Sequence, residues 1–331
     1  MSPSPAVATA DGDLFADLVG HGQARALLGA ALQQRRLAPA YLFAGPHGVG
    51  RRLAALRFLE GVLAGPTGDP LVRRRLQEGN HPDLLWLEPT YSEKGQLVPL
   101  SQAEAAGVSR RAAPQMRLEQ IREVSRFLAR RPVEAPGCLV VLDGAEAMAE
   151  AAANALLKTL EEPGQGLLIL VATSPDLLLS TIRSRCQHIP FGRLDGQQLQ
   201  AVLAAHAADP ADAAVSASGD PPELVQLAAG SPGALLELRR QWQTLPEGLA
   251  ERLQRLPGCA EPLQALDLAR DLSEALDGEQ QLWLLQWWQQ TLWNRHRRPD
   301  QLQRLERLRS HLRAYVQPRL AWEVALLELA G

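Results

Sequence analysis

Residues 41–63 are YLFAGPHGVGRRLAALRFLEGVL, a short apolar run followed by a glycine-bearing turn and a helical pattern. The turn has the frame of a phosphate-binding loop, because Gly45, Gly48 and Gly50 let the backbone bend tightly and point N–H groups at an anion. The helix that follows adds partial positive charge at its N-terminus. A strand, such a loop and a helix, in this order, predict an α/β fold with a phosphate-type site.

Two side chains depart from those of a working loop. An ATP-hydrolysing loop ends in Lys, which reaches the terminal phosphates, and Ser or Thr, which holds Mg²⁺; this chain has Arg51 and Arg52. Only Lys94 and Lys158 among the 34 basic residues are lysines, so a general use of Arg is one explanation of Arg51. It does not explain Arg52, since a guanidinium cannot ligate Mg²⁺. Two interpretations stay open: a turn that binds nothing, and weak ATP binding without hydrolysis, so no cofactor is expected to be required.

Short apolar runs alternate with helical patterns over the first 190 residues. This alternation is typical of a parallel sheet covered by helices. The runs are 41–44, 84–87, 138–142 and 167–172, and the helical patterns are 23–36, 53–63, 118–129 and 147–160. Ligands of such sheets bind outside the carboxyl ends of the strands. We therefore expect Asp143 and Thr173, which follow two of the runs, to join the phosphate loop in one site.

Asp143 stands where nucleotide-hydrolysing folds hold Mg²⁺ and orient the attacking water. Active enzymes carry an Asp-Glu pair here, whereas Gly144 follows Asp143, and Glu146 is one helical step too far along to be assumed a substitute. A helix N-cap is an equally strong interpretation of Asp143. We predict no metal site and no zinc, because the three cysteines Cys138, Cys186 and Cys259 lie far apart without a CxxC spacing.

At 331 residues the chain exceeds a comfortable single core, so we expect several domains. The predicted divisions are a disordered tail at 1–13, an α/β domain at 14–192 with an inserted loop at 91–115, a small helical lid domain at 193–240 and an all-α domain at 241–331. No apolar run approaches the length of a bilayer crossing, and the N-terminus lacks a signal pattern, so we expect no membrane contact and a cytoplasmic protein.

The formal net charge of −3 argues against a surface built wholly for nucleic acid. Eight arginines nevertheless fall between Arg295 and Arg319, against two acidic residues. A solvated helix face is the plainer interpretation of this stretch. A stand-alone DNA-binding protein is the alternative that it raises.

Three later elements, in order, point to a family. They are residues 154–163, NALLKTLEEP; the run 167–172 with Thr173-Ser174; and residues 181–186, TIRSRC, with Gly20-His21 and His81-Pro82-Asp83 preceding them. Over residues 14–240 this order resembles the clamp-loader subunits of bacterial DNA polymerase III, which belong to the AAA+ class. The last ninety residues agree with that family only in length and helical character.

The resemblance implies a AAA+ α/β domain, a helical lid and a C-terminal collar domain that mediates oligomerisation. It implies that Arg185 enters the ATP site of an adjacent subunit as an arginine finger. The implied partners are gamma/tau ATPase subunits and a delta subunit in a hetero-oligomeric ring, with the sliding clamp and primer-template DNA as indirect partners. The zinc-binding cysteine cluster of many relatives is missing, because residues 60–80 contain no cysteine.

Whether this chain is itself an enzyme depends on its altered positions. Arg51, Arg52 and Gly144 depart from the pattern of active ATPases, and Gly233 stands where they commonly carry a sensor arginine; Arg185 is intact. We expect a silent stator without intrinsic ATPase activity inside the holoenzyme. An active motor ATPase, or a related DNA-remodelling ATPase, is the alternative.

Overall fold

A computed structural model describes residues 13–93, 95–103, 105–108, 113–162, 164–207, 220–257, 261–314 and 316–330. The chain divides into two compact units, residues 1–202 and 203–331. Apart from Asp13, the predicted tail lies outside the described residues. The predicted boundary between a lid and a collar domain, at 240, stays a prediction.

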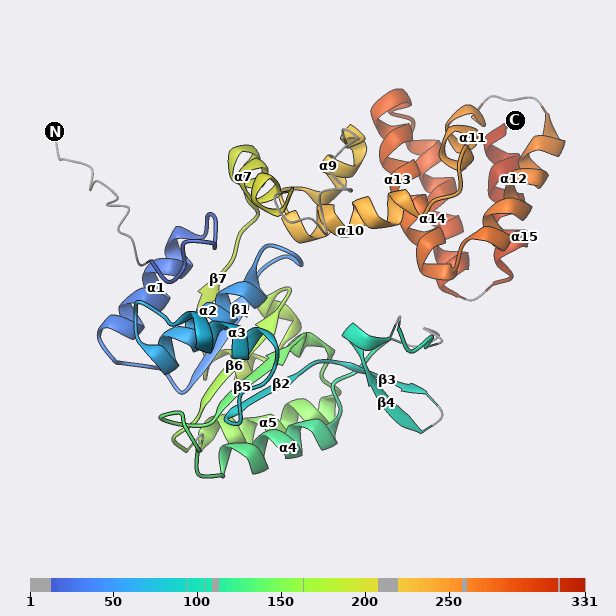
Figure 1. Cartoon of the computed structure of the whole chain (residues 1–331). Coiled ribbons are helices and arrows are strands. Elements are labelled where there is room, and N and C mark those ends of the chain that lie inside the picture. The colour runs from blue at the N-terminus through green and yellow to red at the C-terminus, as the bar shows by residue number, and fades with distance from the viewer. Residues whose placement is uncertain are drawn as a thin grey trace. The chain divides into compact units, whose positions relative to one another are not determined.

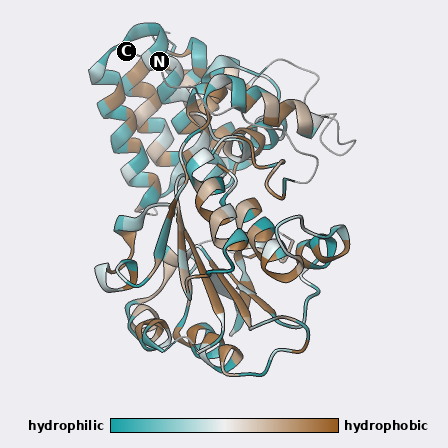
Figure 2. Ribbon diagram, turned by 90° about the vertical axis from the view of Figure 1, so that its left-hand side faces the viewer, coloured by the Kyte–Doolittle hydropathy of each residue, from teal (hydrophilic) through white to brown (hydrophobic). Residues whose placement is uncertain are grey.

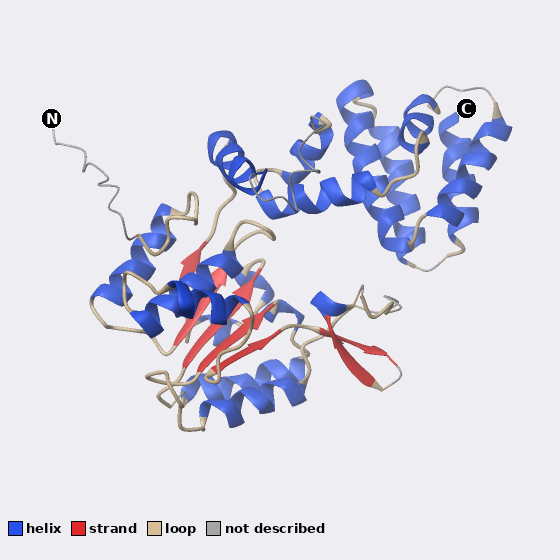
Figure 3. Cartoon of the chain, in the orientation of Figure 1, coloured by secondary structure: helices blue, strands red, loops and turns tan. Residues whose placement is uncertain are grey.

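The first unit is built on a five-stranded parallel sheet (Figures 1 and 3). Its strands are β1 (Ala40–Ala44), β2 (Leu84–Leu87), β5 (Leu139–Asp143), β6 (Leu167–Ala172) and β7 (Gln187–Pro190), in the spatial order β2-β5-β6-β1-β7. β1, β5 and β6 lie in the middle, where both faces are covered, which is why their residues are almost all apolar. The predicted parallel sheet is confirmed, with each apolar run at or within one residue of its strand.

Helices cover both faces of the sheet, and their apolar sides face it (Figure 2). One layer holds α1 (Gly22–Gln33), α2 (Arg51–Ala64) and α3 (Pro70–Gln77), and the other holds α4 (Leu118–Leu128), α5 (Glu150–Glu161) and α6 (Ser180–Arg183). Because successive strand residues point to opposite faces, Phe43 packs under the first layer and Leu42 under the second.

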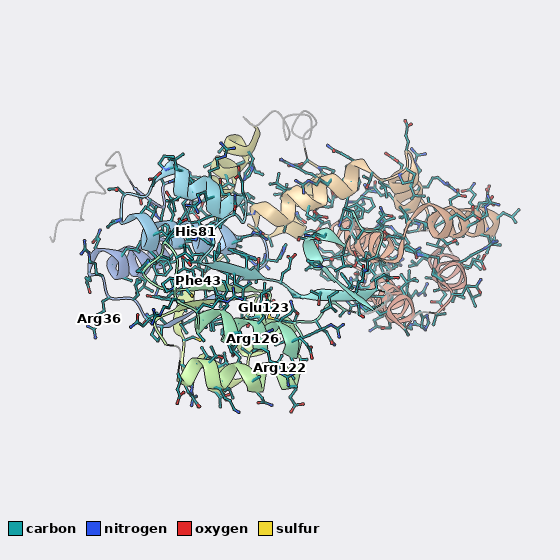
Figure 4. The ribbon with its side chains drawn as sticks, turned by 60° about the horizontal axis from the view of Figure 1, so that its bottom comes forward. Arg36, Phe43, His81, Arg122, Glu123 and Arg126 are labelled. Carbon is teal, nitrogen blue, oxygen red and sulfur yellow. The ribbon has the colours of Figure 1, made fainter. Side chains whose placement is uncertain are left out.

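Helix α4 shows how the sequence pattern places a helix on the sheet. Ile121, Val124 and Phe127 recur at the three-residue spacing of one helical face and are buried. The residues between them, Arg122, Glu123 and Arg126, are exposed and are labelled on this helix in Figure 4. The same figure labels Phe43, which is fully buried in the interior of the unit.

The predicted inserted loop at 91–115 contains regular structure in its first part, which the sequence pattern did not indicate. Residues 90–99 form an antiparallel hairpin of β3 (Thr90–Glu93) and β4 (Gln96–Pro99), followed by the short 3-10 helix η1 (Leu100–Gln102). Gly95 supplies the left-handed turn between the strands, at a φ of 82°. Gln96 and Leu97 of β4 are exposed and Val98 and Pro99 are half-buried, so the strand needs no apolar alternation and leaves no periodic signal in the sequence.

The second unit is helical throughout its described residues. Helix α7 (Gly196–Ala207) leads into it, and its other helices are α9 (Pro222–Ala228), α10 (Pro232–Gln243), α11 (Leu249–Arg255), α12 (Pro262–Ala275), α13 (Gly278–His296), α14 (Pro299–Arg313) and α15 (Pro318–Ala330). Tryptophans fill its core: Trp287, Trp288 and Trp322 are at most 1% exposed. The aromatic clustering of this region therefore reflects internal packing, and among the described residues of the unit only Trp293 is an exposed tryptophan, at 42%.

Helices of the length and apolarity that a bilayer crossing requires are absent from the described part of the chain.

Candidate phosphate site and an outward arginine

The glycine-bearing loop after β1 has the conformation that its sequence predicts. Gly48 and Gly50 have φ values of 75° and 107°, which only glycine adopts readily. A side chain at Gly45 would clash with the carbonyl oxygen of Phe191 on the neighbouring chain segment. The loop thus delivers the chain directly into α2, whose first residue is Arg51.

His21 holds this loop from outside it. Its Nε2 atom lies 2.8 Å from the carbonyl oxygen of Val49, and its ring packs 5.1 Å from that of Phe191. Burial lowers the pKa of His21, although the hydrogen bond to Val49 opposes this. A neutral ring that donates its Nε2 proton fits this position. In the sequence His21 stands out only through the family resemblance, because its partner lies 28 positions away.

Arg51 points inward rather than into solvent. The residue is 7% exposed, and its Nη1 atom has no hydrogen-bond partner among the described residues. Burial lowers the pKa of Arg51, and the charges of Glu146 and Asp143 oppose that shift. The guanidinium therefore lies near the acidic residues at the carboxyl end of β5, which is where a phosphate-binding lysine would also be directed.

Arg52 places its guanidinium beside Asp143, the residue that stands where nucleotide-hydrolysing folds hold a magnesium ion. Its Nη1 atom lies 3.5 Å from Oδ2 of Asp143, and its guanidinium lies 4.7 Å from the ring centroid of Trp86 on β2. Burial raises the pKa of Asp143, while the charges of Arg52 and Arg51 act to lower it. The N-cap interpretation of Asp143 is wrong, because Gly144 occupies the N-cap position of the 3-10 helix η2 (Ala145–Ala147).

Glu146, set aside on sequence grounds, belongs to this edge of the sheet. Its Oε1 atom accepts hydrogen bonds from the backbone N–H of Thr173 at 3.1 Å and from its hydroxyl at 2.7 Å. The 3-10 turn after β5 brings the carboxylate back toward β6, across 27 positions of sequence. Within the described residues, the other carboxylate oxygen has no partner.

The carboxyl edge of the sheet thus gathers every residue predicted for the phosphate site. Gly45, Gly48, Gly50, Arg51 and Arg52 follow β1, Asp143 ends β5, and Thr173 follows β6. These residues do not fit the magnesium ion of an ATP-hydrolysing site. A guanidinium stands in place of the hydroxyl ligand and is paired with Asp143, and Gly144 offers no base. No group of three or more metal-type ligands occurs in the part of the chain that the structure describes.

Arg185 lies at the opposite edge of the same sheet. Gln187, the first residue of β7, pairs with Tyr41 near the start of β1, so Arg185 precedes the amino end of its strand. Its side chain is 37% exposed. One guanidinium nitrogen, Nη1, donates to the carbonyl oxygen of Thr181 at 2.9 Å, and the other, Nη2, donates to Oε1 of Glu161 at 2.9 Å. The arginine is therefore held at the surface, away from this chain's own phosphate loop.

The neighbouring cysteine is not a reactive group. Burial raises the pKa of Cys186 to about 12, so its thiol stays protonated near neutral pH. Cys138 is also buried as a free thiol, and Cys259 lies outside the described residues.

Comparison with known proteins agrees with this architecture. A family model described as DNA polymerase III, delta subunit matches residues 20–195, and one described as cyanobacterial DNA polymerase III delta prime, C-terminal domain matches residues 197–329. The fold is shared with a DNA polymerase III gamma subunit-related protein of Thermotoga maritima, at a TM-score of 0.52 and 15% identity, covering 92% of this chain and 99% of that one.

Curated relatives include subunits of the same polymerase. The chain is 36% identical over 156 residues to a subunit delta' of Pseudomonas aeruginosa and 32% identical over 180 residues to one of Bacillus subtilis. These matches cover 45% and 53% of this chain, and 42% and 48% of the relatives. A gamma/tau subunit of Mycobacterium tuberculosis is 34% identical over 194 residues, which are 57% of this chain and 30% of that protein. The chain belongs to the delta-prime family of bacterial DNA polymerase III clamp-loader subunits.

Proposed function

We propose that this chain is a catalytically silent clamp-loader subunit that donates Arg185 to the ATP site of a neighbouring ATPase subunit. The observation that carries the proposal is the separation of two edges of one sheet. At the carboxyl edge the chain's own Arg52 pairs with Asp143, and at the amino edge Arg185 is exposed. A subunit built in this way acts on a partner's nucleotide rather than on its own.

The donated guanidinium has a physical role in phosphoryl transfer. Negative charge develops on the oxygens around the transferred phosphoryl group in the transition state, and a fixed arginine neutralises it. Arginine fingers of this kind contribute about 10³–10⁵ in rate. Such a residue needs to be accessible to a neighbouring subunit, and the exposed side chain of Arg185 supports this role.

The proposed assembly is a hetero-oligomeric ring with gamma/tau-type ATPase subunits and a delta subunit. The ring would load a sliding clamp onto primed DNA during replication, and we propose that it does so in the cytoplasm. No zinc or other resident cofactor enters the proposal. Binding of ATP to the altered loop without turnover remains compatible with it.

Ion pairs of Arg309 and Arg319, two of the eight arginines between Arg295 and Arg319, favour a solvated helix face over a stand-alone DNA-binding surface. Arg309 pairs with Glu306 at 3.2 Å, and Arg319 pairs with Glu323 at 2.8 Å. An arginine that is already paired with a glutamate on its own helix attracts a phosphate group less strongly. A gel shift by the purified chain alone, if strong and sensitive to salt, would favour the DNA-binding alternative.

The first test is ATP turnover by purified components. The chain alone is expected to show no DNA-stimulated hydrolysis, and sustained turnover would instead support an active motor ATPase. In a complex reconstituted with gamma/tau and delta subunits, Arg185→Ala should remove most turnover at the one site that Arg185 completes. The total ATP turnover of the complex then falls by the fraction that this one site contributes. The amount of chain that co-purifies with its partners is unchanged. Unchanged turnover in an assembled complex would remove the arginine-finger assignment.

A further inference from the structure

The guanidinium of Arg185 is held in place by a residue that no sequence motif assigned a role. Glu161, the last residue of α5, accepts a hydrogen bond from Nη2 of Arg185 at 2.9 Å. The carbonyl oxygen of Thr181, within α6, accepts from Nη1 at the same distance. Two acceptors on different elements thus fix both terminal nitrogens of one planar group.

We infer that Glu161 is a positioning residue for the arginine finger, an inference that rests on the proposed role of Arg185. A guanidinium carries five N–H donors, and the bonds to Thr181 and Glu161 use one from each terminal nitrogen. Nη1 also lies 3.5 Å from the hydroxyl oxygen of Ser184, whereas Nη2 keeps a second proton, so the group can still donate to a phosphate oxygen. Glu161 and Thr181 therefore restrain the arginine without consuming its capacity to bind an anion.

Restraint matters because an arginine side chain has a large conformational entropy. A free Arg185 would have to be ordered in every catalytic cycle, and that cost would be subtracted from its interaction with the transition state. Glu161 orders the side chain before the partner's nucleotide is engaged. The pair lies at the end of α5, where the carbonyl groups of the last turn also favour a nearby cation.

The ion pair is too exposed to be explained by its contribution to folding. The side chains of Arg185 and Glu161 are 37% and 54% exposed, and exposed ion pairs contribute little to stability. Contact with a partner would exclude water around the pair and strengthen the attraction. The role of Glu161 is then visible in the rate of ATP turnover by the complex and not in the stability of the chain.

The test uses the reconstituted complex and compares Glu161→Gln with Glu162→Gln. Glu162 is also exposed and carries the same charge one position further on, so it is a matched control. The measured quantity is the Arg185-dependent turnover, which is the difference in kcat between complexes with wild-type chain and with Arg185→Ala. Co-purification and thermal melting of each variant report assembly and folding.

Glu161→Gln is expected to lower the Arg185-dependent turnover about tenfold, with the KM for ATP and the melting temperature unchanged. Glu162→Gln should match the wild type, and Glu161→Asp should restore part of the loss. In the Arg185→Ala background, Glu161→Gln should have no further effect, because no guanidinium remains to be positioned.

The outcomes separate this inference from the proposed function. If Arg185→Ala leaves turnover unchanged, the proposed function fails, and the positioning role fails with it. If Arg185→Ala lowers turnover but Glu161→Gln does not, or if the two losses add independently, only the positioning role fails. A rise in turnover for Glu161→Gln would show that Glu161 holds the arginine away from its target, which also overturns the inference.

Discussion

At the scale of single residues, the phosphate loop differs from that of an active ATPase at two positions, those of the phosphate-binding lysine and of the magnesium-binding hydroxyl. Arg52 lies between Asp143 and the ring of Trp86 and supplies a fixed cation at the end of β5. Arg51 is buried beside the same acidic groups. Arg51 keeps the positive charge of the lysine that it replaces, whereas Arg52 adds a positive charge and removes the hydroxyl ligand of the magnesium ion.

The double substitution Arg51→Lys and Arg52→Thr is expected to give the chain a magnesium-dependent affinity for ATP. Lysine would again reach the terminal phosphates, and threonine would free Asp143 and add a hydroxyl ligand. Titration calorimetry with and without Mg²⁺ measures the change, and hydrolysis should stay absent because Gly144 is unchanged. If the wild-type chain shows the same magnesium dependence, Arg52 does not block the site.

Asp83 is a second residue whose role follows from its hydrogen-bond partners. Its carboxylate accepts hydrogen bonds from the backbone N–H groups of Val133, Glu134 and Ala135 at 2.7, 2.7 and 2.8 Å. Burial acts to raise the pKa of Asp83, but these three bonds outweigh it and hold the pKa below its usual value. The residue therefore fixes the loop that leads into β5.

Asp83→Asn is expected to destabilise this unit by about 3 kcal/mol at neutral pH, because an amide nitrogen would face backbone donors. Since the folded-state pKa is lowered, the stabilisation by Asp83 is complete above its unfolded value near 4 and is lost as the pH falls through the folded-state pKa. Urea unfolding and hydrogen exchange at residues 133–135 measure this difference. If the difference in free energy of unfolding between the wild type and Asp83→Asn stayed constant down to about pH 2, this role of the Asp83 carboxylate would be contradicted.

At the scale of elements, the segment between the phosphate loop and β2 is fixed by a buried carboxylate. Glu60 on α2 is 0% exposed and accepts from Nε and Nη2 of Arg73 on α3, at 2.9 and 3.1 Å. It also accepts from the backbone N–H of Asp69 at 3.0 Å. Arg57 lies within 3.4 Å of the same carboxylate. The chain thus ties α3 to α2 with ion pairs, in a segment that contains no cysteine.

Glu60→Gln is expected to lower the free energy of unfolding by about 3 kcal/mol, because it leaves buried donors without a charged acceptor. Glu78→Gln is the matched control on the same segment, since Glu78 pairs with Arg74 only at the surface, 51% and 77% exposed. The control should be indistinguishable from wild type in urea unfolding. Equal effects of both substitutions would show that burial of the carboxylate is not what matters.

At the scale of the whole molecule, the two units carry different parts of the proposed work. The first unit contains both the altered phosphate loop and Arg185, and its core is made by residues before position 192. The second unit has its own core, in which Trp322 donates from Nε1 to Oε1 of Gln281 at 3.0 Å. The family resemblance implies that the C-terminal helices of the second unit mediate oligomerisation.

A chain ending at Val202 is expected to fold but not to co-purify with gamma/tau and delta subunits. It keeps the sheet, both helix layers and Arg185, and it loses the helical unit to which the family resemblance assigns oligomerisation. Circular dichroism checks the fold of the shortened chain, and Arg185→Ala in the full chain is the control that should still assemble. Retained assembly of the folded, shortened chain would place the main contacts on the first unit instead.

The sequence by itself determined four of the five strands of the parallel sheet, the helices α1, α2, α4 and α5 that cover it, the phosphate-loop frame and the loss of its lysine and hydroxyl. These features are local, because a repeat of apolar residues, a glycine or a missing side chain affects only residues a few positions away in the sequence. Only the tertiary structure decided that Arg52 pairs with Asp143, that Glu146 reaches Thr173 and that Glu161 holds Arg185. Each of these pairs joins segments 24 or more positions apart, and their meeting depends on how the sheet and its helix layers pack.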